Sequence, residues 1–233
     1  MALVTDEAVI LRTVNYGDTS KILTLYSRNN GKINCIVKGA RNIKSRVLGV
    51  IEPFNHITIV FYNKENRDLQ MLSKAETIKN FRVIKTDLDK LTISYRILET
   101  MNKAVYDKEH SNELFELLIK SFTYINESNP EKSAENFISY LYFQVHLCEL
   151  LGISPIDKIE TEGDTFKSRE MFLNRPQYEM IKYILENDIV KMDSGMAANE
   201  TILNLMSIYD KYLADHTENF IKLKTVRVFN QMN

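Results

Sequence analysis

Positively charged side chains gather in one part of the sequence, between Asp18 and Glu52. The 33 residues between these two acids contain no Asp or Glu but seven Lys or Arg residues. Lys and Arg neutralise phosphate groups and release their counterions, and Arg can bind a phosphate through two parallel hydrogen bonds. The run therefore predicts contact with a polyanion, and an ordinary solvated surface is the alternative. The seven residues are Lys21, Arg28, Lys32, Lys38, Arg41, Lys44 and Arg46.

Aromatic residues are interleaved with these charges. Proteins that bind single strands combine a positive groove with aromatic faces on which bases stack. We include Tyr26 in the predicted contact set, and Tyr16 and Tyr62 are further candidates. For Phe54 and Phe61 we favour a place in the hydrophobic core, because Phe is so often buried. No base-reading motif is present, so we expect the protein to bind single strands of any nucleotide sequence.

A second basic cluster lies near the end of the sequence, in "IKLKTVRVF". It contains Lys222, Lys224 and Arg227, which alternate in part with apolar residues. A contact with DNA and an ordinary closing segment are equally good interpretations. We expect this C-terminal tail to pack on the first domain.

Residue patterns typical of catalysis are missing from the sequence. The four histidines, His56, His110, His146 and His216, have no spacing typical of a metal site. The sequence has neither the GxxxxGK[ST] phosphate loop nor the GxSxG nucleophile motif. Cys35 lies in a predicted strand and is expected to pack rather than react. We therefore expect a protein that is not an enzyme.

The sequence favours a cytoplasmic protein. Its two cysteines, Cys35 and Cys148, are far apart and do not suggest a disulfide framework. The N-terminal residues lack the basic region of a signal peptide, and no apolar run approaches the ~20 residues of a membrane span.

Charge and residue pattern divide the chain near residue 80. Residues 1–80 contain 12 basic and 7 acidic residues, a net charge of +5, and residues 81–233 contain 18 and 24, a net charge of −6. Residues 1–80 read as five short strands separated by turn residues, which suggests a small barrel or sandwich. The predicted strands are 8–14, 21–27, 32–39, 54–62 and 67–76.

Residues 81–233 change to a helical period. Apolar residues recur every three or four positions, and Pro130 and Gly152 stand where a helix would begin and end. The predicted helices are 86–106, 112–125 and 130–151, with two more near 176–186 and 198–214. We expect an α+β multidomain protein in which a five-stranded β-barrel (1–80) precedes an all-α helical domain (81–233).

Residues 8–54 resemble the N-terminal domain of the bacterial RecO family of recombination mediators. The matching pieces are "LRT", "YGDTSKILTLYS", "GK", "VKGAR", a Ser–Arg pair and "EPF", in that order. Further along, "LCELLGISP" and "LKTVRVF" are also similar. The resemblance implies an OB-fold barrel followed by a helical domain, and it favours DNA contact by Arg41, Lys44 and Arg46.

The same resemblance implies partners. The family binds single- and double-stranded DNA, acts with a RecR-type protein, and receives the acidic C-terminal tail of single-stranded-DNA-binding protein on its helical domain. Lys103, Lys108 and Lys120 are candidates for the positive rim of such a peptide groove. The expected location is the cytoplasm, at the nucleoid.

Many family members also carry a zinc site after the "LLG" motif, formed by two CxxC pairs. A structural zinc usually needs four Cys or His ligands. Here residues 153–175 contain neither Cys nor His, so we expect a degenerate insertion without zinc and no other cofactor.

Three functions remain open. The favoured one is a non-enzymatic recombination mediator that binds DNA, anneals complementary strands and helps load the recombinase. The alternatives are an adaptor that binds only proteins and an OB-fold protein that binds RNA.

Overall fold

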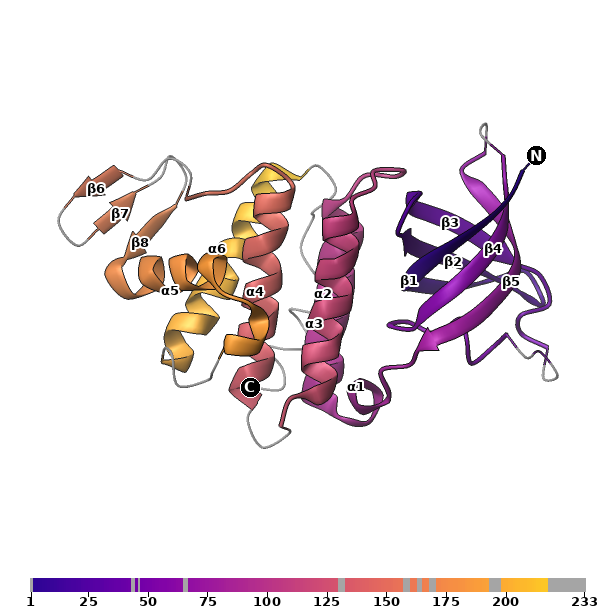
Figure 1. The fold of residues 1–233 in the computed structure, drawn as a ribbon, viewed down its shortest axis with the longest axis horizontal. Coiled ribbons are helices and arrows are strands. Elements are labelled where there is room, and N and C mark those ends of the chain that lie inside the picture. The colour runs from indigo at the N-terminus through magenta and orange to yellow at the C-terminus, as the bar shows by residue number, and fades with distance from the viewer. Residues whose placement is uncertain are drawn as a thin grey trace. The chain divides into compact units, whose positions relative to one another are not determined.

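The computed structural model describes residues 2–42, 45, 47–64, 67–129, 133–156, 160–162, 165–167, 171–192 and 198–217. It divides into two compact units (Figure 1). The barrel unit comprises Met1–Arg82 and Val105–Ile119, and the helical unit comprises Val83–Ala104 and Lys120–Asn233.

Five strands form the barrel, as the sequence predicts. They close in the order β1-β2-β3-β5-β4, and all neighbours are antiparallel except the parallel pair β3 and β5. This arrangement agrees with the predicted OB-fold. The strands are β1 (Ala2–Tyr16), β2 (Ser20–Ser27), β3 (Gly31–Val37), β4 (His56–Asn63) and β5 (Leu69–Lys79).

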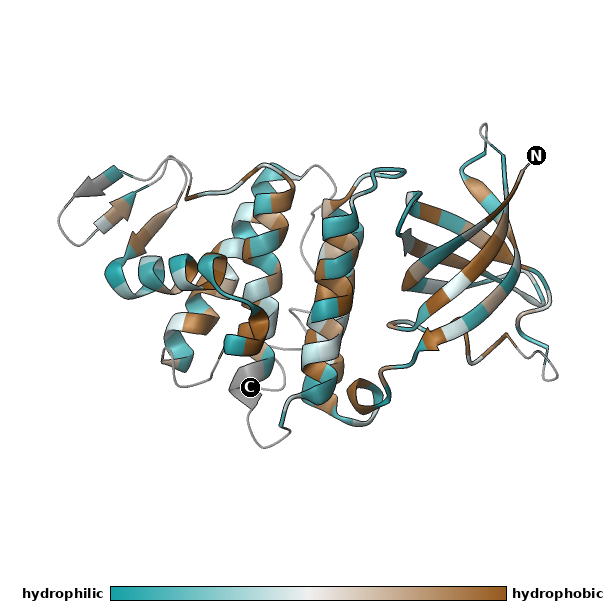
Figure 2. Ribbon diagram, in the orientation of Figure 1, coloured by the Kyte–Doolittle hydropathy of each residue, from teal (hydrophilic) through white to brown (hydrophobic). Residues whose placement is uncertain are grey.

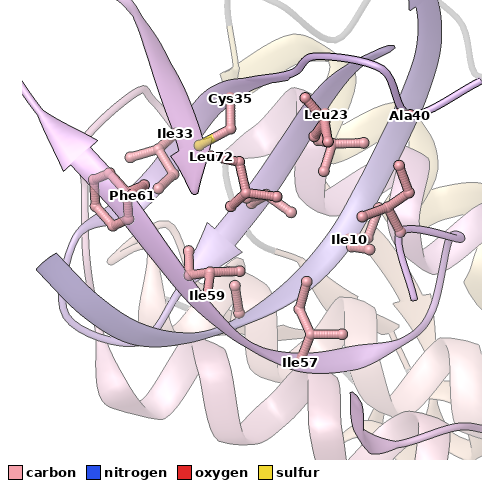
Figure 3. Packing of buried hydrophobic residues seen from close by; sticks show 13 residues of the cluster. Ile10, Leu23, Ile33, Cys35, Ala40, Ile57, Ile59, Phe61 and Leu72 are labelled. Carbon is pink, nitrogen blue, oxygen red and sulfur yellow. The ribbon is translucent and has the colours of Figure 1, made fainter. Parts of the chain in front are cut away.

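Alternating side chains fill the barrel. Successive residues of a strand point to opposite faces, so every second residue points inward. Leu23, Cys35, Ile59 and Phe61 meet there, with at most 1% of each exposed (Figure 3). Brown and teal therefore alternate along these strands (Figure 2). The core position expected for Phe61 and the packed position expected for Cys35 are confirmed, and burial raises the pKa of the Cys35 thiol to about 12.

Phe54 is buried, as expected, but it does not lie in a strand. The prediction that a strand begins at Phe54 is wrong, because β4 begins at His56. Phe54 has a φ of 70°, a left-handed conformation that ends any extended segment. Its backbone N–H donates to the carbonyl of Ile10 at 3.2 Å, which ties this turn to β1.

A segment beyond the predicted barrel also packs on it. Residues 105–111 lie against the start of β3, where the N–H of Lys108 donates to the carbonyl of Lys32 at 3.0 Å. Lys32 is buried, and its ammonium group donates to the carbonyl of Val105 and pairs with Asp107 at 3.3 Å. Residues 105–119 thus belong to the barrel unit, although the sequence places them within the helical domain.

Gly31 is where this segment approaches the barrel most closely. It has a φ of +65°, and a Cβ added there would overlap the carbonyl oxygen of Glu109 and lie 2.9 Å from the N of His110. We expect Gly31→Ala to lower the free energy of unfolding by about 2–4 kcal/mol, since left-handed backbone and overpacking each cost ~1–3 kcal/mol. Gly17, with a φ of +54° and nothing within 4 Å of its added Cβ, is the control.

Urea unfolding of both alanine variants separates the two costs. Gly17→Ala should lose about 1 kcal/mol, which is the backbone cost alone. Equal losses in the two variants would show that residues 105–111 do not press on Gly31.

Asp6 organises the turn between β2 and β3. Its carboxylate accepts hydrogen bonds from the side chains of Ser27, Asn29 (2.7 Å) and Asn30 (2.6 Å), and from the N–H of Asn29 at 3.1 Å. Burial raises the pKa of Asp6, but the hydrogen bonds from Ser27, Asn30 and Asn29 outweigh it and hold the pKa below its ordinary value of 3.8.

A lowered carboxyl pKa makes this turn sensitive to pH. Since the pKa is lower in the folded state, the carboxylate stabilises the fold above the unfolded pKa, and this stability is lost as pH falls through the folded pKa. We expect Asp6→Asn to cost about 2 kcal/mol at pH 7, because bonds to a charged acceptor are lost. The cost should shrink below pH 3.8. Urea unfolding from pH 2.5 to 7 measures the loss of unfolding free energy in Asp6→Asn. Asp68→Asn is the control, because Asp68 is exposed. A loss that does not change with pH would contradict the prediction.

Helix α4 is the centre of the helical unit. It packs against α2, α5 and α6, and its described side chains are buried on nearly all sides, which explains why it is apolar around its whole circumference. His146 on α4 hydrogen-bonds the carbonyl of Ile184 at 3.2 Å, so it is a satisfied, half-buried residue. The helices are α1 (Arg82–Thr86), α2 (Leu88–Ala104), α3 (Asn112–Glu127, which begins in the barrel unit), α4 (Ser133–Leu150), α5 (Arg175–Glu186), the 3-10 helix η1 (Ile189–Lys191) and α6 (Asn199–His216). Among the described helices, none is long and apolar enough to cross a bilayer.

A small antiparallel sheet follows α4 and was not predicted. It consists of β6 (Glu160–Glu162), β7 (Thr165–Lys167) and β8 (Phe172–Asn174), so the second unit is not purely helical. Phe166 of β7 stacks on Tyr178 of α5 at 4.1 Å between ring centroids. Since residues 153–175 offer no Cys or His, they do not fit the zinc site implied by the resemblance, and aromatic packing joins the sheet to α5 instead.

A buried ion pair links three helices of this unit. Arg96 of α2 donates to Asp210 of α6, which also accepts from Tyr140 and Gln144 of α4, both at 2.7 Å. Thr100 of α2 hydrogen-bonds the Tyr140 hydroxyl at 2.8 Å. Burial outweighs Arg96 and raises the pKa of the Asp210 carboxyl.

Candidate nucleic-acid interface

The outer wall of the barrel carries a continuous row of apolar side chains. Residues directly opposite each other in a ladder point to the same face. Beginning from Val14 on β1, each member of the row is paired with the next one on the neighbouring strand. Val14 is 41% exposed, Met71 37% and Leu3 61%. The row is Val14, Ile22, Ile36, Met71, Tyr62 and Leu3.

A pocket of about 240 Å³ opens on this row, where β3, β4 and β5 meet. Its apolar wall is formed by four residues from these strands, and three cations line the same pocket. The apolar residues are Ile36, Tyr62, Leu69 and Met71. The cations are Lys38, Lys64 and Arg67, and Gln70 completes the lining.

Gln70 holds the backbones of Lys64 and Arg67. Its Oε1 accepts from the N–H of Lys64 at 2.9 Å, and its Nε2 donates to the carbonyls of Lys64 (3.0 Å) and Arg67 (2.7 Å). Gln70 is itself only 6% exposed. The backbones of both cationic residues, Lys64 and Arg67, are therefore hydrogen-bonded to one buried side chain.

No described acidic side chain offsets the charge of these three cations. Among the described residues that line the pocket there is no Asp or Glu, and no described carboxylate forms an ion pair with Lys38, Lys64 or Arg67. Three positive charges around one small pocket repel each other and attract an anion. The site therefore suits a ligand that has both negative charge and an apolar face.

Three of the predicted contact residues are at least partly exposed. Lys38 lines the pocket itself, and Lys21 is half-exposed on β2, where it is paired with the buried Val37 and so does not share the face of the apolar row. Arg41 is exposed, and its guanidinium donates to the carbonyl of Gly17 at 3.0 Å. These residues remain predicted DNA contacts.

Arg28 is engaged within the barrel unit. Its guanidinium forms ion pairs with Glu7 at 3.2 Å and Glu116 at 2.6 Å, and lies 4.3 Å from the centroid of the Phe115 ring. His56 also contacts Glu7, at 3.1 Å, and burial lowers the pKa of His56 despite that carboxylate. Two carboxylates already satisfy Arg28, so it is a weak candidate for phosphate.

Two predicted contacts are corrected by their burial. Tyr26 is fully buried, and its hydroxyl accepts from the N–H of Ser111 at 3.1 Å, so its ring has no face free for a base. Lys32 is buried and bound to Val105 and Asp107, so its charge does not reach the surface. Both residues join the barrel to residues 105–111 and are removed from the predicted interface.

Other predicted residues lie outside the described part of the chain. These are Lys44, Arg46, Lys222, Lys224 and Arg227. The expected packing of the C-terminal tail on the first domain also falls on residues outside the described part. In the helical unit, Lys103 pairs with Glu99 at 3.0 Å and Lys120 pairs with Asp188. Lys108 is an exposed residue of the barrel unit.

Lys64 and Arg67 were missed by the sequence analysis. Lys64 lies in "NKEN", which reads as a polar turn, and Arg67 opens the predicted strand 67–76; Glu65 and Asp68 offset their charge. The signal that could have found them is their place between the fourth and fifth strands, since the loop there commonly binds oligonucleotides in an OB-fold.

Comparison with known proteins agrees with this architecture. The family model "Recombination protein O N terminal" matches residues 1–81, and "Recombination protein O C terminal" matches residues 85–156. The chain belongs to the RecO family. The first match covers the whole barrel and its pocket, and the second covers the helical unit through α4.

Individual RecO proteins align over different lengths. The DNA repair protein RecO of Salinibacter ruber is 31% identical over 167 residues, which are 70% of this chain and 62% of that protein. RecO of Pelodictyon phaeoclathratiforme is 34% identical over 66% of this chain and 57% of its own length. RecO of Chlorobium limicola aligns over 92% of this chain and 94% of its own length, at 25% identity. The chain thus covers less than two thirds of the first two relatives.

Proposed function

We propose that this protein is a non-enzymatic mediator of recombinational DNA repair that binds DNA through its barrel. The observation that carries the proposal is the pocket with three cations and, among its described lining residues, no acid, on a barrel whose residues match the RecO family. The proposal places the protein in the cytoplasm, at the nucleoid.

Charge neutralisation explains how such a protein would anneal DNA. Two complementary strands repel each other through their phosphates, and Lys and Arg remove part of that repulsion while releasing counterions. Lys38, Lys64 and Arg67 supply this charge at the pocket, and Lys21 and Arg41 are further predicted contacts elsewhere on the barrel. Binding to single and double strands follows, because both carry phosphates.

The proposed partners follow from the family. With a RecR-type protein, the mediator would load the recombinase onto strands covered by single-stranded-DNA-binding protein, whose tail would bind the helical unit. Lys103 and Lys120 are already paired with Glu99 and Asp188, so they lend little support to a rim for that tail.

A salt titration tests DNA binding directly. The affinity for a labelled single strand is measured from 50 mM to 400 mM salt, and its logarithm should fall linearly with log salt, by ~0.7 per phosphate contacted. Addition of the complementary strand then scores annealing. Absent or salt-independent binding would contradict the proposal and favour the protein adaptor, and tighter binding of a matched RNA would favour an RNA-binding protein.

A further inference from the structure

The apolar wall of the pocket is not needed for binding phosphates. Charge neutralisation requires only the three cations, yet Ile36, Tyr62, Leu69 and Met71 line the same site. Met71 remains 37% exposed, and it stands directly between Tyr62 and Ile36 in the ladders of β4, β5 and β3. Exposed apolar side chains that meet in a pocket mark a surface for an apolar ligand.

A single strand offers the matching chemistry. An unpaired base presents a flat apolar face within a few ångströms of negative phosphates, whereas a duplex keeps its base faces stacked inside. A pocket that combines an aromatic ring, aliphatic walls and cations at its edge complements an unpaired base with its phosphates. It does not complement a duplex.

We propose that this pocket receives one unpaired base of a DNA single strand. The base would lie against Tyr62 and Met71, while Lys38, Lys64 and Arg67 hold the phosphates on either side. This inference rests on the proposed DNA binding and deepens it, because it assigns the barrel a preference for unpaired, base-bearing strands.

The size of the pocket agrees with a single base. Its volume of about 240 Å³ lies below the ~300–1,000 Å³ of pockets that hold drug-sized ligands. A base pair or a stack of bases does not fit such a volume. The rest of the strand would follow the row across Ile36, Ile22 and Val14, on the outer wall of the barrel.

The lining also predicts that the pocket accepts every base. Among the described lining residues, Gln70 is the side chain with an amide, and both of its N–H donors are bound by the carbonyls of Lys64 and Arg67. An amide that is bound in this way has no donor left to read the edge of a base. Binding by stacking is tolerant of sequence, because every base has an aromatic face.

Three DNA probes of equal length test the inference by fluorescence anisotropy. They are a thymidine single strand, a strand of the same length that is abasic at every position, and a duplex. The unmodified protein should bind the thymidine strand at least 5-fold more tightly than the abasic strand, since one stacked base contributes about this much or more. Equal binding of the two single strands would overturn the base pocket and leave the proposed DNA binding intact, and failure to bind any probe would overturn both.

Variants of Tyr62 locate the effect in the pocket. Tyr62→Ala should weaken binding of the thymidine strand about 10-fold and change the abasic strand and the duplex less than 2-fold. Tyr62→Phe keeps an aromatic face and should preserve the preference, and Tyr106→Ala is the control because Tyr106 is exposed and is not among the residues that line the pocket. Circular dichroism shows whether each variant is folded.

Two results would overturn the assignment. An equal loss for all three probes in Tyr62→Ala, with Tyr62→Phe also impaired, would show that Tyr62 supports the fold rather than a base. If the two single strands bind alike while an acidic peptide with hydrophobic side chains binds in a Tyr62-dependent manner, the pocket is a peptide site.

Discussion

Replacing Lys38, Lys64 and Arg67 together by alanine is expected to weaken single-stranded DNA binding about 100-fold at 0.1 M salt. Each phosphate contact contributes ~0.7 to the slope of log affinity against log salt, so three contacts contribute about 2. At 1 M salt counterion release contributes nothing, so the variant and the unmodified protein should bind alike there. From 1 M to 0.1 M salt, a slope that is lower by 2 makes the affinity of the variant about 100-fold weaker. Fluorescence anisotropy at four or five salt concentrations measures both the slope and the affinity.

The control is a triple variant with the same change in charge elsewhere on the surface. Lys74, Lys182 and Lys211 are exposed and do not line this pocket. Their replacement by alanine should lower the slope by less than 0.5 if binding is local to the pocket. Equal effects of the two triple variants would mean that only net charge matters, and that the pocket is not the DNA site.

The second large effect is expected on stability, from Arg96→Met. Arg96 is 4% exposed, and its removal leaves the Asp210 carboxylate buried without its cation. Breaking one side of a buried pair typically costs ~3–5 kcal/mol. Thermal and urea unfolding should show this loss, together with weaker association of α2 with α6.

The loss should depend on pH. Burial already raises the pKa of Asp210, and loss of Arg96, whose charge lowers it, raises it further. Because the folded-state pKa is then above the unfolded one, the variant is most stable at low pH and loses stability as pH rises through the folded pKa. Unfolding at pH 5 and pH 8 measures the difference, and a pH-independent loss would contradict it.

A double variant separates the charge from the packing. Arg96→Met with Asp210→Leu removes both charges and should recover much of the loss, because a buried pair replaced by apolar residues is often neutral. Failure to recover would show that the bonds from Tyr140 and Gln144 to Asp210 carry the stability instead.

The barrel was predictable because its signals are local. Alternating apolar residues and Gly- or Asn-containing turns identify β2 and β3 within a residue or two of their bounds. Strands β6 to β8 have three residues each, too few for alternation to be recognised. The burial of Tyr26 and Lys32 depends on residues 105–111, about 80 positions away, and no local pattern encodes it.

The candidate site was predictable only in part. Lys38 belongs to a long run without acids and was found by charge alone. Lys64 and Arg67 sit beside Glu65 and Asp68, so their segment looks neutral until strand pairing brings it next to Ile36 and Lys38. The apolar row was invisible for the same reason, because its six members come from all five strands and are adjacent only through the ladders.

The discontinuity of the barrel unit has a consequence during synthesis. The unit needs residues 105–119 to cover Tyr26 and to satisfy Lys32, so it is incomplete when residue 82 leaves the ribosome. Another 37 residues must follow, which takes about 2–7 s at translation rates of roughly 5–20 residues per second. During that interval the nascent barrel carries an uncovered lysine and tyrosine at one end, and its final stability is reached only after α2 has already emerged.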